Sequence, residues 1–227
     1  MIKLINISFQ YDNASTETLK NINLELETGE VLAVVGPSGG GKSTLLRVIA
    51  GLEKPKVGEI FLGEKCLCKK GTFVNPEKRG IGMLFQDYAL FPHMTVAKNI
   101  EYGLIGMNTT ERKKRVKEVL GLVNLVEYEK RYPHELSGGQ QQRIALARAI
   151  AATPKILLLD EPFSNLDTHL LQSVREELFG IIREIGITTI MVTHNPEDAT
   201  TQADRVIEIV EGIASEKNWT KNNKGFI

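Results

Sequence analysis

A glycine-rich segment has the residue types and spacing of a phosphate-binding loop: Gly36-Pro37-Ser38-Gly39-Gly40-Gly41-Lys42-Ser43. Glycines let backbone N–H groups turn inward and approach phosphate oxygens closely. A helix that begins at the loop points its positive end to the same place. Lys42 supplies a charge for the β- and γ-phosphates, Ser43 offers a hydroxyl to Mg²⁺, and Thr44 is a further binding candidate. The segment predicts a chain that binds a nucleoside triphosphate and hydrolyses it.

Two carboxylates follow an apolar run that has the character of a buried strand. The run is Ile156–Leu159, and Asp160 and Glu161 come directly after it. Ligands of open α/β sheets bind at the carboxyl ends of strands, so these acids are expected beside the phosphate loop. We expect Asp160 to orient the Mg²⁺ shell and Glu161 to position and deprotonate the attacking water.

A second anion-binding segment is predicted at Ser137-Gly138-Gly139-Gln140. A Ser-Gly-Gly turn that opens a helix combines a hydroxyl, unpaired N–H groups and a helix dipole. Taken alone, the same residues are also typical of an ordinary helix cap. One chain therefore contains two candidate phosphate-binding helix starts.

Strands and helices must alternate to place these segments. Apolar periodicity predicts strands at 2–9, 22–26, 31–35, 58–62, 80–85, 156–159, 188–193 and 206–210. It predicts helices at 43–50, 110–122, 138–152 and 170–184, and no strand between 87 and 152. Solid apolar strands that alternate with helices indicate an α/β fold with a largely parallel sheet covered on both faces.

The composition is that of an ordinary soluble protein and excludes some functions. Among 227 residues, 28 Lys and Arg balance 28 Asp and Glu, so there is no basic excess to attract nucleic acid. The start of the chain lacks a signal peptide, and no apolar run approaches the roughly 20 residues that span a bilayer. Cys66 and Cys68 are too few for a metal site and are expected as alternate residues of a strand or turn. A cytosolic protein is expected, with any membrane role arising through a partner.

The order of these motifs closely resembles the nucleotide-binding subunit of ABC transporters, from Met1 to about Gly212. Residues 136–140 match the signature motif of that family, and Gln86 matches its Q-loop glutamine. Residues 164–167, Ser-Asn-Leu-Asp, match the D-loop, and His194 matches the switch histidine. Tyr11 lies where the family places an aromatic residue that stacks on adenine.

The resemblance implies the ABC ATPase fold. It is a phosphate-loop NTPase core with a mostly parallel sheet, an antiparallel β subdomain and a helical insertion. Residues 1–86 and 153–215 are expected to form the catalytic core with its β subdomain, and residues 87–152 the helical subdomain that carries the signature. Residues 216–227 form a polar tail that is expected to fray.

The resemblance also implies the mechanism and the ligands, ATP and Mg²⁺. Two copies would pair head to tail, with each ATP between the phosphate loop of one copy and Ser137 to Gln140 of the other. Gln86 would contact Mg²⁺ and the water, and His194 would contact the γ-phosphate and hold Glu161 in place. Efficient hydrolysis would then require a dimer.

The apolar stretch 85–96 resembles the groove of importer ATPases that receives a short helix of the membrane subunit, although internal packing would also explain it. Residues 132–135 and 140–143 support the importer type, with ferric-iron and polyamine importers nearest. Integral permease subunits and an extracytoplasmic solute-binding protein are the implied partners, at the cytoplasmic side of the cell membrane. Many such ATPases carry a C-terminal regulatory domain. The sequence stops at Ile227, either because it is truncated or because the protein lacks that domain.

Two other functions are compatible with the same site. An efflux or lipoprotein-release ATPase would have an identical nucleotide site. A soluble ABC ATPase acting on DNA or the ribosome usually has a long coiled-coil insertion or two nucleotide domains, and neither is visible. We expect no nucleic-acid partner.

Overall fold

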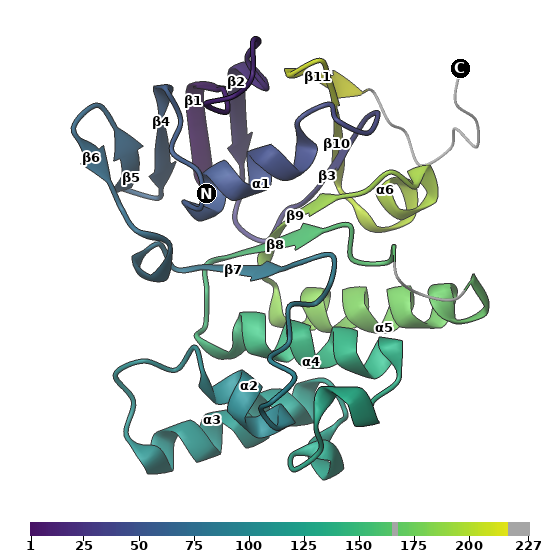
Figure 1. Ribbon diagram of the computed structural model, residues 1–227. Helices are drawn as coiled ribbons and strands as arrows, with labels where there is room; N and C mark the ends of the chain where they lie inside the picture. Colours follow the sequence, from purple (N-terminus) through teal and green to yellow (C-terminus); the bar gives the residue numbers. More distant parts are fainter. Residues whose placement is uncertain (165–167, 218–227) are drawn as a thin grey trace. The chain divides into compact units, whose positions relative to one another are not determined.

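The structure is a computed structural model that describes residues 1–164 and 168–217 (Figure 1). The chain divides into two compact units. The first comprises residues 1–81 and the described residues from 187 onward, and the second comprises residues 82–186. The predicted core assigned residues 153–186 to the first part, whereas the compact units group them with the helices of the second. The functional division into core and helical subdomain stays a prediction.

An antiparallel sheet forms one layer of the first unit, in the strand order β2-β1-β4-β5-β6. Apolar side chains of β1 alternate toward the buried face, which follows from the two-residue period of a strand. The elements are β1 (Ile2–Phe9), β2 (Leu19–Leu26), β4 (Val57–Leu62), β5 (Lys65–Lys69), β6 (Thr72–Phe73) and the 3₁₀ helix η1 (Pro76–Lys78).

A second sheet of this unit has the order β11-β10-β3-β9. Strand β3 is parallel to both of its neighbours, and only the edge strand β11 is antiparallel. Helix α1 packs on β9 and helix α6 packs on β3. The elements are β3 (Val31–Val35), α1 (Lys42–Ala50), β9 (Thr188–Val192), α6 (Pro196–Gln202), β10 (Arg205–Val210) and β11 (Ile213–Lys217).

The second unit consists of two neighbouring strands and four α-helices, of which α4 contacts each of the other three. Its strands are β7 (Ile81–Leu84) and β8 (Ile156–Asp160), and the latter is completely buried. Its helices are α2 (Val96–Glu101), α3 (Thr109–Leu122), α4 (Gly138–Ala151), α5 (Thr168–Ile185) and the 3₁₀ helices η2 (Val126–Tyr128) and η3 (Pro133–Glu135).

A buried arginine of the first unit closes the far end of α1. Arg79 is 1% exposed, and burial lowers the pKa of its guanidinium. Its Nη1 donates to the carbonyls of Val48 (3.0 Å) and Ile49 (2.8 Å), and its Nε donates to Val74 (2.8 Å). The first two carbonyls belong to the last turn of α1, where no N–H of the helix is available. Gly51 leaves the room for this side chain, because a Cβ there would stand 2.2 Å from Arg79 Nε.

Replacing Arg79 by Met is therefore expected to destabilise the fold strongly. The carbonyls of Ile49 and Val74 would lose their donor in a dry environment, and the carbonyl of Val48 would keep only the N–H of Gly51. The expected cost is about 3 kcal/mol. Urea denaturation measures the loss. Arg112→Met is the matched control, since Arg112 Nε donates to a single carbonyl, that of Met107, and about 1 kcal/mol is expected. Equal losses in the two variants would contradict the role given to Arg79.

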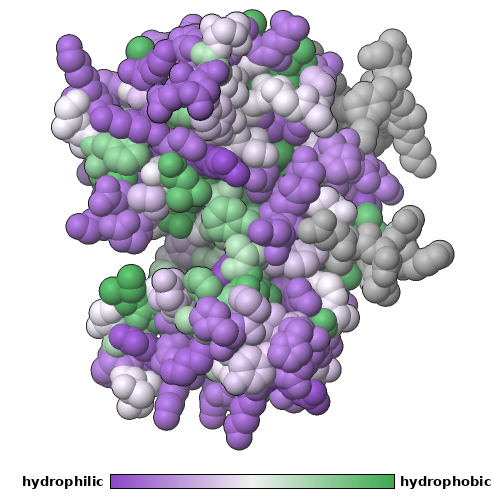
Figure 2. All heavy atoms as spheres, in the orientation of Figure 1, coloured by the Kyte–Doolittle hydropathy of each residue, from purple (hydrophilic) through white to green (hydrophobic). Residues whose placement is uncertain are grey.

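The strands and helices predicted from apolar periodicity are confirmed, with boundaries within three residues. The expected absence of strands between 87 and 152 is confirmed, and Cys66 and Cys68 lie on β5 as predicted. On the face shown in Figure 2, hydrophilic residues predominate and apolar ones form small groups. None of the described helices combines the length and apolar composition that a bilayer span requires.

Candidate nucleotide site

The glycine-rich loop connects β3 to α1 and is held by close backbone contacts within the first unit. Gly36 (φ 138°), Gly39 (φ 77°) and Gly41 (φ 105°) have backbone angles that side chains with a Cβ rarely adopt. A Cβ on Gly36 would stand 2.2 Å from the carbonyl oxygen of Ile209. At Gly41 it would stand 2.7 Å from the carbonyl oxygen of Thr18. At Gly40 it would stand 2.8 Å from the carbonyl oxygen of Ile209, so the loop conformation depends on glycine at these three positions.

Lys42 occupies the centre of this loop. The side chain is buried (5% exposed), and Nζ donates to the carbonyls of Gly36 and Pro37, each at 2.9 Å. No carboxylate pairs with Nζ in the described part of the chain. The residue before it, Gly41, caps α1 without any side-chain hydrogen bond, so the first N–H groups of the helix lack a side-chain acceptor. A buried cation and an uncapped helix start thus meet at one place, which is an environment suited to an anion.

Tyr11 lies beside the helix that follows the loop. Its hydroxyl is 3.3 Å from Oγ1 of Thr44, and its ring packs edge-on against Phe9 with centroids 4.7 Å apart. The ring is half-buried. The structure thus brings the predicted adenine-contacting residue to the phosphate-loop helix.

His194 follows β9 in the same unit and is exposed. Its neighbour Thr193 is buried, and Thr193 Oγ1 donates to Oδ2 of Asp198 (2.8 Å) and accepts from the N–H of Asn195 (3.0 Å). Asn195 in turn caps α6. The backbone on both sides of His194 is therefore fixed. The sequence contains a signal for this helix start, since Asn195 precedes a Pro and the acidic residues Glu197 and Asp198.

Asp160 and Glu161 lie at the end of β8 in the second unit. Asp160 is 7% exposed, and Glu161 has a left-handed backbone angle (φ 45°). The carbonyl of Glu161 accepts hydrogen bonds from the N–H (3.2 Å) and the hydroxyl (3.0 Å) of Ser164. Buried Gln142 donates to the carbonyl of Pro162 at 3.0 Å. A non-glycine residue held at positive φ is strained, and such residues concentrate at functional sites.

The predicted signature segment begins α4 through a capping box. Ser137 Oγ accepts from the N–H of Gln140 (3.4 Å), and Gln140 Oε1 accepts from the N–H of Ser137 (2.9 Å). Ser137 and Gly138 are exposed. The box uses one of the donors at the helix start, and the N–H groups of Gly138 and Gly139 have no acceptor within the helix. The segment can therefore cap the helix and still have N–H groups available to bind an anion.

Gln86 is exposed in the turn after β7. The segment that follows it is fixed by two side chains that sequence analysis did not single out. Arg148 donates to the carbonyls of Tyr88 (2.8 Å) and Ala89 (2.6 Å), two residues with left-handed backbone angles. Burial lowers the pKa of Arg148. In the sequence, Arg148 lies in the predicted helix after the signature motif, and nothing there indicates its contacts with the turn.

Asn99 of α2 is the other organising residue of this segment. It is fully buried and accepts from the N–H of Phe91 (2.8 Å). Its Nδ2 donates to the carbonyls of Phe91, Met94 and Thr95, each at 3.1 Å. A polar side chain within an apolar stretch is the signal that could have identified it.

The predicted site residues divide between the two units. Tyr11, Gly36 to Thr44 and His194 lie in the first unit, and the Tyr11 hydroxyl reaches the phosphate-loop helix there. Gln86, Ser137 to Gln140, Asp160 and Glu161 lie in the second. Ser164 of the predicted D-loop is described, whereas Asn165, Leu166 and Asp167 lie outside the described residues, as does most of the predicted tail.

Comparison with known proteins bears on the family and the fold of the chain. A family model described as ABC transporter matches residues 19–164. The spermidine/putrescine import ATP-binding protein PotA of Borreliella afzelii is 45% identical over 215 residues, covering 94% of this chain and 61% of that protein. The Fe(3+) ions import ATP-binding protein FbpC 2 of Pectobacterium atrosepticum is 45% identical over 217 residues, with coverage of 95% and 62%. The sulfate/thiosulfate import ATP-binding protein CysA 1 of Agrobacterium fabrum is 45% identical over 217 residues, with coverage of 93% and 61%.

The chain thus spans about three fifths of the length of the curated relatives it matches. Among solved structures, the dimeric post-hydrolysis state of the ATP-binding cassette MJ0796 bound to ADP and Pi has a TM-score of 0.78 and 34% identity. That match covers 95% of this chain and 98% of the other. The predicted ABC ATPase fold is confirmed. The chain belongs to the ABC transporter family, whose ATP-binding subunits are ATPases.

Proposed function

We propose that this chain binds ATP through the loop Gly36 to Ser43 and hydrolyses it as the motor subunit of an ABC importer. One observation carries the proposal: Lys42 is a buried ammonium group that donates to two neutral carbonyls of the loop itself. A buried charge is costly unless it is paired. The β- and γ-phosphates of ATP would supply the missing negative charge, and the uncapped start of α1 would bind the same phosphates through its N–H groups.

The residues present fit a bound Mg²⁺. In the described part of the chain, no three His, Cys, Asp or Glu side chains gather into a metal site. Mg²⁺ in nucleotide sites is held by one or two protein groups together with substrate phosphates and waters, so such a cluster is not needed. The Ser43 hydroxyl, the Asp160 carboxylate and Gln86 are the proposed ligands. The ion would neutralise charge that develops on the phosphates.

Glu161 is the proposed general base for the attacking water, with Gln86 and His194 as its partners in positioning. Glu161 has a left-handed backbone angle (φ 45°), and Ser164 donates hydrogen bonds to its carbonyl. A backbone fixed in an uncommon conformation supports a functional role for this residue. The fixed backbone around His194 supports the role of a group that must meet the γ-phosphate repeatedly in one orientation. Tyr11 is proposed to stack on adenine.

We propose that the complete site needs a second copy of this chain. The N–H groups at the start of α4 and the exposed Ser137 would bind the ATP held by the loop of the partner copy. The dimeric state of MJ0796, with its bound ADP and Pi, supports this proposal. It also explains why one chain has two anion-binding helix starts.

The importer assignment rests on the relatives named import ATP-binding proteins. We propose that permease subunits dock on the segment 88–96 at the cytoplasmic side of the membrane and that a solute-binding protein delivers the solute. Arg148 and Asn99 would keep this segment rigid, so that closure of the dimer is transmitted. Polyamines and ferric iron are the proposed solutes, and sulfate has equal support from the relatives' names.

Substitution of Lys42 by Ala tests the nucleotide proposal. ATP affinity, measured with a fluorescent analogue, is expected to fall at least about 100-fold, because a desolvated charge contact to phosphate is lost. Lys3→Ala is the matched control, since Lys3 is a half-exposed lysine paired with Glu25 on the antiparallel sheet. If Lys42→Ala binds ATP as tightly as the control, the proposal is wrong.

A further inference from the structure

A cavity on the antiparallel sheet of the first unit has an excess of positive charge. Its volume is about 590 Å³, and four lysines and one glutamate line it: Lys54, Lys56, Lys69, Lys70 and Glu59. Four ammonium groups against one carboxylate give a formal charge of +3, in a chain whose net charge is zero. The volume lies in the range of small-molecule sites.

The floor of the cavity is built by an irregularity in the sheet. The pairing of β1 shifts register around Asn6, which has a left-handed backbone angle (φ 53°). Gly58 of β4 (φ 108°) packs so closely there that a Cβ would stand 2.6 Å from the carbonyl oxygen of Asn6. A bulge of this kind interrupts the ladder and redirects the strand. The hollow is therefore a defined feature of the backbone.

Two of the four lysines have no partner within the described chain. Lys56 Nζ donates to Gln10 Oε1 at 2.5 Å, and Lys54 Nζ lies 5.9 Å from the centre of the Phe73 ring. The side-chain ammonium groups of Lys69 and Lys70 form neither hydrogen bonds nor ion pairs to any described residue. Lys69 pairs with Thr72 across the β5–β6 hairpin, so Lys70 lies in a two-residue turn. The hairpin holds both uncompensated charges at the cavity.

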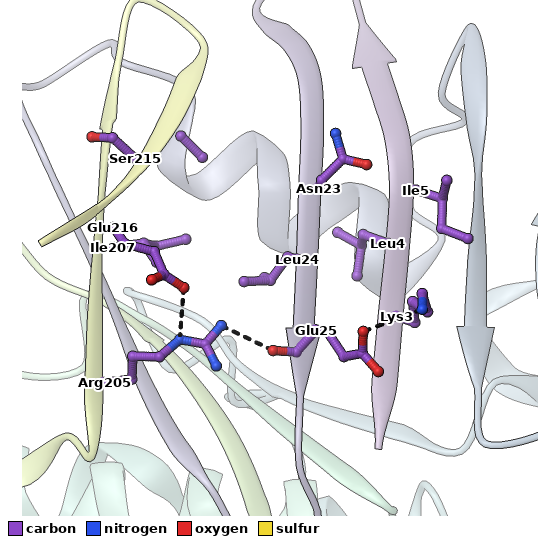
Figure 3. Close-up of a pocket in the computed structure, with 11 residues that line it drawn as sticks. Lys3, Leu4, Ile5, Asn23, Leu24, Glu25, Arg205, Ile207, Ser215 and Glu216 are labelled. Atoms are coloured by element: carbon purple, nitrogen blue, oxygen red, sulfur yellow. Dashed lines mark hydrogen bonds and ion pairs between the residues drawn. The ribbon is translucent and has the colours of Figure 1, made fainter.

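Another large cavity of this unit has balanced charges (Figure 3). It measures about 480 Å³ and is lined by two cations and two anions. Lys3 pairs with Glu25 at 3.2 Å, and Arg205 Nε lies 3.6 Å from Glu216 (Figure 3). Arg205 also donates to the carbonyl of Glu25 at 2.9 Å. The charged groups of this cavity pair with one another, whereas Lys69 and Lys70 of the lysine-lined cavity leave a local excess of positive charge that an external anion could neutralise.

We propose that the lysine-lined cavity binds a multivalent phosphate-bearing anion, at a site distinct from the phosphate loop. Ammonium groups bind phosphate as point charges, and several of them at one place favour an anion that carries more than one negative charge. The phosphate could come from a soluble phosphorylated metabolite or from a lipid headgroup, and the chemistry of recognition is the same. Occupancy would depend on salt, because the lysines are exposed.

Calorimetric titration with inorganic pyrophosphate tests this site. The Lys42→Ala variant of the whole chain is used, because it disables the phosphate loop. Saturable binding is expected in this background. Adding Lys69→Gln and Lys70→Gln should weaken it at least about tenfold, and adding Lys3→Gln should leave it unchanged. Retained affinity in the Lys69/Lys70 variant, or an equal loss with Lys3→Gln, would overturn the proposal.

The source of the phosphate is distinguished with vesicles. Co-sedimentation with phosphatidylglycerol vesicles but not with phosphatidylcholine vesicles, lost on Lys69→Gln and Lys70→Gln, would assign a lipid headgroup. Pyrophosphate binding without co-sedimentation would assign a soluble ligand. The absence of both pyrophosphate binding and co-sedimentation would overturn the proposal. Circular dichroism of each variant verifies that it is folded. A negative result here leaves the Lys42 test of ATP binding unaffected.

Discussion

Replacing Glu161 by Gln is expected to leave ATP binding intact and to reduce steady-state ATP hydrolysis by about 10²- to 10⁴-fold, the usual contribution of a positioned general base. The amide has the same shape as the carboxylate but cannot accept the proton of the attacking water. The loop Gly36 to Ser43, which we propose binds the phosphates, is unchanged. Phosphate release and equilibrium binding of a fluorescent ATP analogue measure the two quantities separately.

Glu211 offers a matched control for this substitution. It is an exposed glutamate whose backbone is also left-handed (φ 48°), and it lies in the turn between β10 and β11. Glu211→Gln should hydrolyse ATP at the unmodified rate. Wild-type turnover in Glu161→Gln would show that another group acts as the base.

Replacing Gly36 by Ala is expected to abolish nucleotide binding through the backbone alone. The new Cβ would stand 2.2 Å from the carbonyl oxygen of Ile209, which belongs to β10 and cannot retreat as a flexible side chain could. At φ 138° an alanine is also strained. The loop must move away from β10 and take its N–H groups out of register with the phosphates. We expect ATP affinity to fall at least about 100-fold, because several charge-assisted hydrogen bonds are lost together.

Gly39 separates the steric effect from the conformational one. Its φ is also positive (77°), yet a Cβ there would meet nothing within 4 Å. Gly39→Ala therefore carries only the backbone cost of a left-handed alanine, about 1–2 kcal/mol. Equal ATP affinities of the two variants would contradict the view that contact with β10 shapes the loop.

Much of the fold could be predicted because its signals are local. The apolar run 31–35 and the glycines after it are read from neighbouring residues, and they form β3 and the loop as expected. The short strand β6 and the edge strand β11 were missed. Thr72–Phe73 is too short to show a period, and β11 is exposed at four of its five positions. Alternation of apolar residues cannot reveal such strands.

The chemistry of the site was easier to predict than the scaffold that holds it. Lys42, Asp160 and Glu161 stand in recognisable strings. Arg148, in contrast, acts on residues 59 and 60 positions away, and Asn99 acts on a turn up to eight positions before it. Their importance depends on burial and on the turn carbonyls that they reach, which appear only once the chain is folded. The lysine-lined cavity could not be predicted either, because it is formed by a β-bulge that appears only in the folded chain.

The most direct test of the account is complementation between two inactive variants. Lys42→Ala disables the proposed phosphate loop, and Ser137→Arg blocks the proposed second anion site. We expect each variant alone to be almost inactive. In a mixed dimer, the intact loop of the Ser137 variant faces the intact helix start of the Lys42 variant, and one complete site forms. An equimolar mixture should recover about a quarter of wild-type hydrolysis, because half of the dimers are mixed and each has one of two sites. Mixed dimers that are verified by native mass spectrometry but remain inactive would contradict a site shared between two copies.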